Sequence, residues 1–163
     1  MAQPNGGTLT LSGTANDFTT ADGVVTVDNG TLGLAKFGNS AGTAVSSMGK
    51  NKQITIKPAA GVSSGIAYAG TSCATSSVKL VLSANAGASA TDKIVISGGA
   101  QGGITMSGDW VQSDYKNAAF WMQLAGEGPL TNVYSGKMTA DQPAGPHIQK
   151  VGAGTWTLGD GNG

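Results

Sequence analysis

The chain has 163 residues, enough for one domain with a sizeable core. Its nine acidic residues balance nine lysines, arginine does not occur, and only 11% of the residues are charged. This composition argues against a basic nucleic-acid-binding surface, and an apolar fraction of 39% without net charge argues against disorder.

Glycine is frequent, with 27 residues, whereas Trp, Tyr and Phe occur only three times each. Such a chain has few large side chains to fill a thick core, so we expect thin, closely stacked layers. The first five residues have neither the charged nor the apolar part of a signal peptide, so no export signal is expected in this chain. No run approaches the roughly 18 apolar residues of a membrane helix, and we expect no membrane insertion by this segment.

Short segments in which an aliphatic residue alternates with a small or polar one follow one another along the chain. This period of two predicts strands with one buried face, and hence an all-β protein. The segments are T-L-T-L at 8–11, V-V-T-V at 24–27, T-L-G-L at 31–34, Q-I-T-I-K at 53–57, V-K-L-V-L-S at 78–83, K-I-V-I-S at 93–97 and G-I-T-M-S at 103–107. Six aliphatic side chains are expected to face one stacked core: Ile54, Ile56, Leu80, Leu82, Ile94 and Ile96.

Glycine-rich turns separate these segments, with D-N-G at 28–30, S-G-G at 97–99 and Q-G-G at 101–103. Residues 38–50 are predicted to form a loop. Many short strands with glycine-rich corners favour a solenoid, in which each strand stacks on the strand of the next coil. A β-sandwich is the alternative.

The alternation fails over residues 109–126. Tyr115, Ala119 and Met122 have the spacing of one helix face, which predicts a short helix or an excursion from the coils. Aromatic rings stack on sugars, but they also close the side of a narrow core, so packing is the preferred interpretation of those found here. A ligand surface, if the chain has one, is expected on the four aromatic residues of this stretch: Trp110, Tyr115, Phe120 and Trp121.

The C-terminal stretch repeats the beginning of the chain. The phrase G-T-x-T-L occurs at residues 7–11 and again at 154–158, with Trp156 in the variable position of the second copy. We interpret residues 1–163 as a single β-solenoid domain. It consists of one long repeat, residues 7–153, and the start of the next repeat at residues 154–163.

Three stretches carry a resemblance to a known family. They are G-T-L-T-L-S-G at 7–13, V-V-T-V-D-N-G-T-L-G-L at 24–34 and K-V-G-A-G-T-W-T-L at 150–158, and they resemble the autotransporter-associated β-strand repeat. In that family the corresponding phrases lie on successive strands of a right-handed parallel β-helix. The resemblance implies a stalk or passenger of a bacterial surface protein, located outside the cell, with no shared catalytic residues. The chain departs from the family at Trp156, where an aliphatic residue is usual.

Residues that could form a catalytic centre are sparse. Parallel β-helices also include polysaccharide lyases and hydrolases, which need clustered carboxylates. Here Glu127 is the only glutamate, and the eight aspartates form no D-x-D pair. His147, the only histidine, is expected in a surface loop beside Pro146. Cys73, the only cysteine, is expected to be buried and unpaired.

The G-D-G-N-G stretch at 159–163 offers two side-chain oxygen ligands, whereas calcium takes six to eight oxygens, so a simple turn is expected. No catalytic residue, metal or cofactor is therefore predicted for this chain.

These observations predict a non-enzymatic structural module of an extracellular bacterial surface protein or self-assembling fibre. The ends of a β-helix expose unpaired backbone groups that bind further strands, so copies are expected to associate head to tail. The alternative is a carbohydrate-binding or adhesive module that uses the aromatic residues at 110–121. A polysaccharide lyase is the third hypothesis. The expected subunit interface comprises Thr8, Leu9, Thr10, Leu11, Thr155, Trp156, Thr157 and Leu158.

Overall fold

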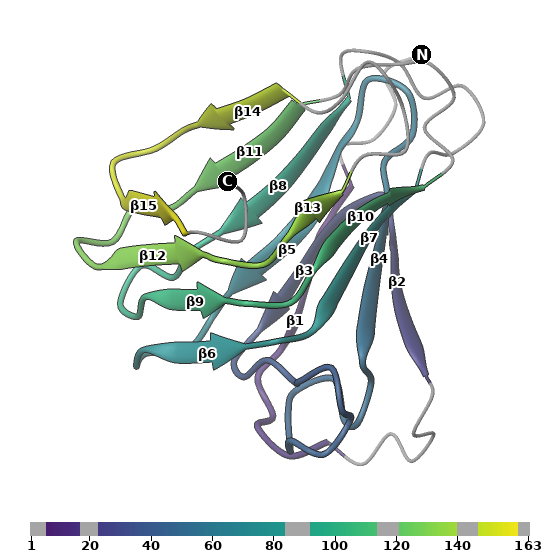
Figure 1. Ribbon diagram of the computed structural model, residues 1–163, viewed down its shortest axis with the longest axis vertical. Helices are drawn as coiled ribbons and strands as arrows, with labels where there is room; N and C mark the ends of the chain where they lie inside the picture. Colours follow the sequence, from purple (N-terminus) through teal and green to yellow (C-terminus); the bar gives the residue numbers. More distant parts are fainter. Residues whose placement is uncertain (1–5, 17–22, 84–91, 114–120, 140–146, 160–163) are drawn as a thin grey trace.

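The computed structural model describes residues 6–16, 23–83, 92–113, 121–139 and 147–159. Within these ranges the chain forms fifteen β-strands and no helix. All the strand pairs are parallel, and they form three sheets (Figure 1). Successive turns of the chain stack on one another, and each sheet receives a strand from successive turns. The predicted parallel β-helix is therefore confirmed, whereas a β-sandwich would require antiparallel sheets.

We name the three sheets walls A, B and C. Wall A has the order β1 (Thr8–Leu11), β3 (Gly30–Leu34), β5 (Ser63–Tyr68), β8 (Lys93–Ser97), β11 (Trp121–Ala125) and β14 (His147–Lys150). Wall B has the order β2 (Val24–Asp28), β4 (Gln53–Lys57), β7 (Lys79–Ser83), β10 (Trp110–Ser113) and β13 (Met138–Thr139). Wall C has the order β6 (Ala74–Ser76), β9 (Ile104–Met106), β12 (Thr131–Tyr134) and β15 (Thr155–Leu158).

From β4 onward the chain passes through walls B, A and C in each turn, and it completes four turns by β15. Parallel neighbours cannot be joined by a tight hairpin, and the strands of the other two walls provide the long connection that they need. Each strand therefore lies beside the strand one turn earlier and the strand one turn later.

The N-terminal end of the solenoid is built differently. Residues 35–52 connect β3 in wall A to β4 in wall B without a strand in wall C, and the predicted loop at 38–50 is confirmed. Phe37 and Met48, at 3% and 0% exposure, belong to the hydrophobic core. This connection therefore supplies apolar side chains at the end of the solenoid where wall C has no strand.

Glycines allow the corners between the walls to stack closely. A Cβ atom at Gly108 would lie 2.0 Å from the carbonyl oxygen of Val78, and one at Gly136 would lie 2.0 Å from that of Gly108. These distances are far too short for a side chain. The corner between walls C and B therefore needs glycine in successive turns.

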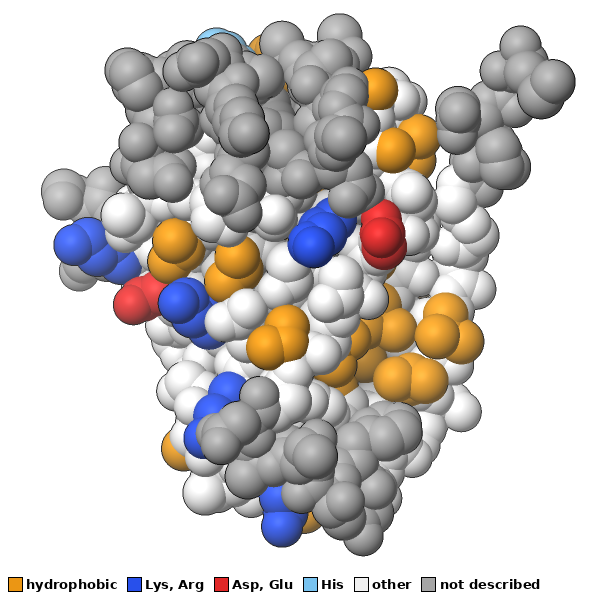
Figure 2. Space-filling view, turned by 90° about the vertical axis from the view of Figure 1, so that its right-hand side faces the viewer, with side chains coloured by type: hydrophobic (Ala, Val, Ile, Leu, Met, Phe, Trp, Pro, Cys, Tyr) orange, Lys and Arg blue, Asp and Glu red, His pale blue; other side chains and the backbone are white. Residues whose placement is uncertain are grey.

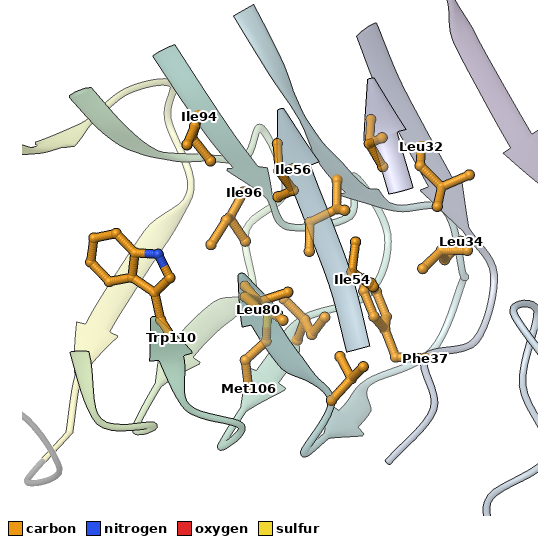
Figure 3. Close-up of a cluster of buried hydrophobic side chains, with 14 of the residues drawn as sticks. Leu32, Leu34, Phe37, Ile54, Ile56, Leu80, Ile94, Ile96, Met106 and Trp110 are labelled. Carbon is orange, nitrogen blue, oxygen red and sulfur yellow. The ribbon is translucent and has the colours of Figure 1, made fainter. Parts of the chain in front are cut away.

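The alternating segments place their aliphatic residues inside the walls (Figure 3). All six core residues predicted from the sequence are at most 1% exposed, and this prediction is confirmed. Aligned positions in successive strands form columns, which we name by their members. One such column in wall B contains Val25, Ile54, Leu80, Trp110 and Met138.

The predicted helix in residues 109–126 is wrong for the described part of that stretch. Trp110–Ser113 is β10 and Trp121–Ala125 is β11, where Met122 is fully buried. Residues 114–120, which include Tyr115 and Ala119, lie outside the described residues. The helical spacing was a local pattern, whereas pairing with β7 and β8 fixes these segments as strands.

Replacement of Leu82 by Ala should lower the free energy of unfolding by about 2–5 kcal/mol, because it removes a fully buried side chain from a stacked column. Chemical denaturation monitored by circular dichroism measures the change. Val81→Ala is the matched control, since Val81 lies on the outer face of the same strand and is only partly buried. An equal loss for both variants would contradict the assignment of the inner face.

Candidate functional site

The N-terminal end of the solenoid carries an apolar groove. It has a volume of about 510 Å³, and its apolar lining includes Leu9 and Leu11 from wall A, Val25 and Val27 from wall B, and Met48 from the connection. Leu9 is 62% exposed and Val24 is 50% exposed. Figure 2 views the molecule from the side of β2, and a group of apolar side chains is visible on that face. Apolar side chains of walls A and B are therefore exposed at this end.

The C-terminal end also exposes apolar side chains. All four residues of β14 are exposed, with Ile148 at 44%, and Leu158 in β15 is 45% exposed. Trp156 is half-buried against the core, and its indole Nε1 donates to the carbonyl oxygen of Ala125 at 2.8 Å. Lys150 donates from Nζ to the carbonyl oxygen of Gly152.

The two strands predicted to form the subunit interface lie at opposite ends of the solenoid. β1 is the outermost strand of wall A at the N-terminal end, whereas β15 is the outermost strand of wall C at the C-terminal end. Thr8, Thr10, Thr155 and Thr157 are all exposed. The two G-T-x-T-L phrases thus occupy different walls, and the interpretation of the chain as one long repeat stays a prediction.

The aromatic residues of the predicted ligand surface are separated. Trp110 is 1% exposed and points into the core (Figure 3), so it offers no ring to a ligand. Trp121 is half-buried on the outer face of wall A, with its ring centroid 4.9 Å from that of His147. Tyr115 and Phe120 lie outside the described residues. The burial of Trp110 agrees with the preferred packing interpretation and removes this ring from the alternative ligand surface, because alternation along β10 turns it inward.

Cys73 is exposed, so the prediction of a buried thiol is wrong. Ala74 and Ser76 begin and end β6, with Ser76 buried, and alternation turns Cys73 to the outer face. Its small neighbours in the sequence suggested burial, but they reflect the corner that precedes β6. Cys73 lines a cavity of about 640 Å³ between β6 and the 35–52 connection, together with Tyr68 and several hydroxyl side chains.

The other residues considered for chemistry do not converge. His147 is exposed as expected, but it begins β14 and does not lie in a loop. Asp160 and Asn162 of the glycine-rich tail lie outside the described residues. Among the described residues, no three His, Cys, Asp or Glu side chains are placed to bind one metal ion.

Buried polar groups link neighbouring turns. The amide of Asn132 accepts from the backbone N–H of Ile104 at 3.0 Å and donates to the carbonyl oxygen of Thr155 at 3.1 Å. The Tyr134 hydroxyl donates to the carbonyl oxygen of Gly108 at 3.0 Å. Burial, and secondarily the charge of Asp109, raises the pKa of the Tyr134 phenol above its usual value. These groups hydrogen-bond across turns and present no polar cluster to a ligand.

Comparisons of the chain with protein-family profiles, curated proteins and solved structures found no match. The resemblance to the autotransporter-associated repeat therefore stays a prediction based on residues 7–13, 24–34 and 150–158. Within the part of the chain that the structure describes, no helix has the length and apolarity to cross a membrane.

The exposed position of Cys73 predicts rapid reaction of the native protein with a thiol reagent. The expected result is one labelled thiol per chain before any denaturant is added, because the side chain lies on the outer face. Absorbance of the released chromophore measures the reaction, and Cys73→Ser should give none. Labelling that starts only on unfolding would show that Cys73 is buried in solution.

Proposed function

We propose that the protein is a non-enzymatic structural module whose coils extend by stacking end to end on further copies of the chain. The observation that supports this proposal is that apolar side chains are exposed at both ends, beside open strand edges. Leu9, Ile148 and Leu158 belong to the outermost strands of walls A and C and are 62%, 44% and 45% exposed. Their burial would be favourable, and open edges supply backbone hydrogen bonds to an added strand.

The two ends carry different strands, so such a contact joins the C-terminal end of one copy to the N-terminal end of the next. A heterologous contact along a common axis does not close on itself and produces a filament. The stacked cross-section favours this geometry, because wall A ends in an outermost strand at each end of the solenoid, β1 and β14.

The setting that fits this role is a bacterial surface protein or an extracellular fibre. This part of the proposal rests on the resemblance of three stretches to the autotransporter-associated repeat, and the β-solenoid is compatible with it. No catalytic residue, cofactor or metal is assigned.

Placing a charge at either end should abolish association. Leu9→Lys and Ile148→Lys put an ammonium group where the proposed contact buries an apolar side chain, whereas Leu130→Lys changes a 38% exposed side chain in a corner of an inner turn. Light scattering against protein concentration measures the mass. The wild type and Leu130→Lys should grow in mass with concentration, while the two end variants should remain monomeric.

Two results would overturn this proposal. One is a wild-type protein that stays a monodisperse monomer at high concentration. The other is growth of both end variants to the mass of the wild type.

A second candidate is glycan binding on the outer face of wall A. One observation favours it: Trp121 lies beside His147, and on the same face Gln123 donates from Nε2 to Oε1 of Gln149 at 2.7 Å. A half-exposed ring beside amide donors and acceptors is an arrangement that can stack on a sugar and bind its hydroxyl groups.

Trp121→Ala tests this candidate on a glycan array. If the surface binds sugar, the variant should lose roughly five- to tenfold in affinity, the effect of removing one stacking ring. Val81→Ala, on the outer face of wall B, is the control. A wild-type protein that binds no glycan would remove the candidate.

A further inference from the structure

The proposed end-to-end contact depends on which outermost strands can pair. The three walls differ in whether their outermost strands have an open edge. At the N-terminal end of wall C, the 35–52 connection lies against β6. Ser76 Oγ donates to the carbonyl oxygen of Gly38 at 3.0 Å, and the N–H of Ser40 donates to Ser77 Oγ at 3.1 Å. The edge of β6 is therefore partly covered, and β15 of another copy would not find an open strand in its own wall.

Wall A has an outermost strand of four residues at each end. Among the described strands, β1 pairs with β3 alone and β14 pairs with β11 alone. In wall B, the described part of β13 comprises two residues, Met138 and Thr139. Among the described strands, wall A is thus the wall that can continue from one copy into the next with four residues on both sides.

We propose that β14 of one copy pairs with β1 of the next as a continuation of wall A, and that Lys150 is the residue that limits this junction. The inference rests on the proposed end-to-end stacking and specifies its interface. It assigns the interface to β14 and β1, whereas the sequence predicted an interface formed by the residues of β1 and β15.

The register follows from the columns of wall A. The outer column ends at Gln149 on one side and at Thr8 on the other, so continuation places Gln149 against Thr8 of the next copy. The inner column adjacent to it contains Leu9, Leu32, Ile66, Ile96, Leu124 and Lys150. Continuation therefore places Lys150 against Leu9.

In this register, the free backbone N–H and C=O groups of β1 and β14 alternate so that they can form hydrogen bonds with each other. The carbonyl oxygens of Gly7 and Leu11 accept from the N–H groups of Thr31 in β3 and of Ala35 directly after it, so those of Thr8 and Thr10 point to the open edge. The N–H of Val151 donates to β11, so the backbone groups of Ile148 and Lys150 point to the open edge of β14. Pairing of Lys150 with Leu9 joins these two sets in a parallel ladder.

Lys150 is the only charged member of its inner column. Its side chain is exposed and bends to the carbonyl oxygen of Gly152. Stacking on Leu9 would bring the ammonium group toward an apolar environment, which costs free energy. An inward-pointing charge on an edge strand is a known means of restricting strand addition, so Lys150 keeps the junction weak.

Disulfide trapping tests the register. In a Cys73→Ser background, Thr8→Cys combined with Gln149→Cys places thiols on neighbouring parallel strands, whose Cα atoms lie about 4.8 Å apart, within the range of a disulfide. Mild oxidation should give a ladder of covalent oligomers on a non-reducing gel. The control pairs Thr8→Cys with Thr157→Cys in β15, and it should give none.

Replacement of Lys150 tests whether its charge weakens the association between copies. Lys150→Leu should lower the dissociation constant of self-association about tenfold or more in sedimentation velocity. Lys93→Leu is the matched control, because it removes the same charge from an exposed position on the outer face of an inner strand, and it should leave the constant unchanged.

The outcomes separate this inference from the proposed function. Association of the wild type without cross-linking of residues 8 and 149, or equal effects of Lys150→Leu and Lys93→Leu, would overturn the inference and leave end-to-end stacking in place. A wild-type protein that stays a monodisperse monomer at high concentration would overturn both.

Discussion

Parallel stacking of one turn on the next is the constraint on which the rest of this structure depends. Neighbouring strands in a sheet lie about 4.8 Å apart, so each position along a wall must suit the same position one turn above and below. Inward positions accordingly form apolar columns, such as Ile54 on Leu80. The corners obey the same rule, because Gly136 lies against the carbonyl of Gly108 with no room for a side chain.

The same constraint determines where polar chemistry is found. Asn132 and Tyr134 are buried, and each hydrogen-bonds to the backbone of another turn. Their polar atoms tie coils together and are not directed to a common point on the surface. A catalytic centre needs such convergence, and the described residues show it nowhere. The buried polar groups of Asn132 and Tyr134 therefore connect neighbouring turns.

Regular stacking also gives the solenoid two ends that cannot be alike. At the N-terminal end, Phe37 and Met48 from a connection replace the missing wall C strands, while an apolar groove stays open between walls A and B. At the C-terminal end, the last strands carry Ile148 and Leu158 in solvent, with Lys150 at the end of an otherwise apolar column. One end is a groove and the other combines apolar residues with a charge, so the two ends present different surfaces.

The sequence by itself determined seven of the strands and six core residues, Leu82 among them, because period-two alternation is a local pattern. Glycine-rich corners favoured a solenoid, and the family resemblance implied the parallel β-helix. The tertiary structure decided what depends on neighbours one turn away. Pairing with β7 and β8 made strands of the ends of the 109–126 stretch, alternation in β6 turned Cys73 outward, and Trp110 entered the core. The repeated G-T-x-T-L phrases looked equivalent, yet they lie in different walls. The wall that a strand joins is set by the length and path of the connection before it. A five-residue sequence motif contains no information on either.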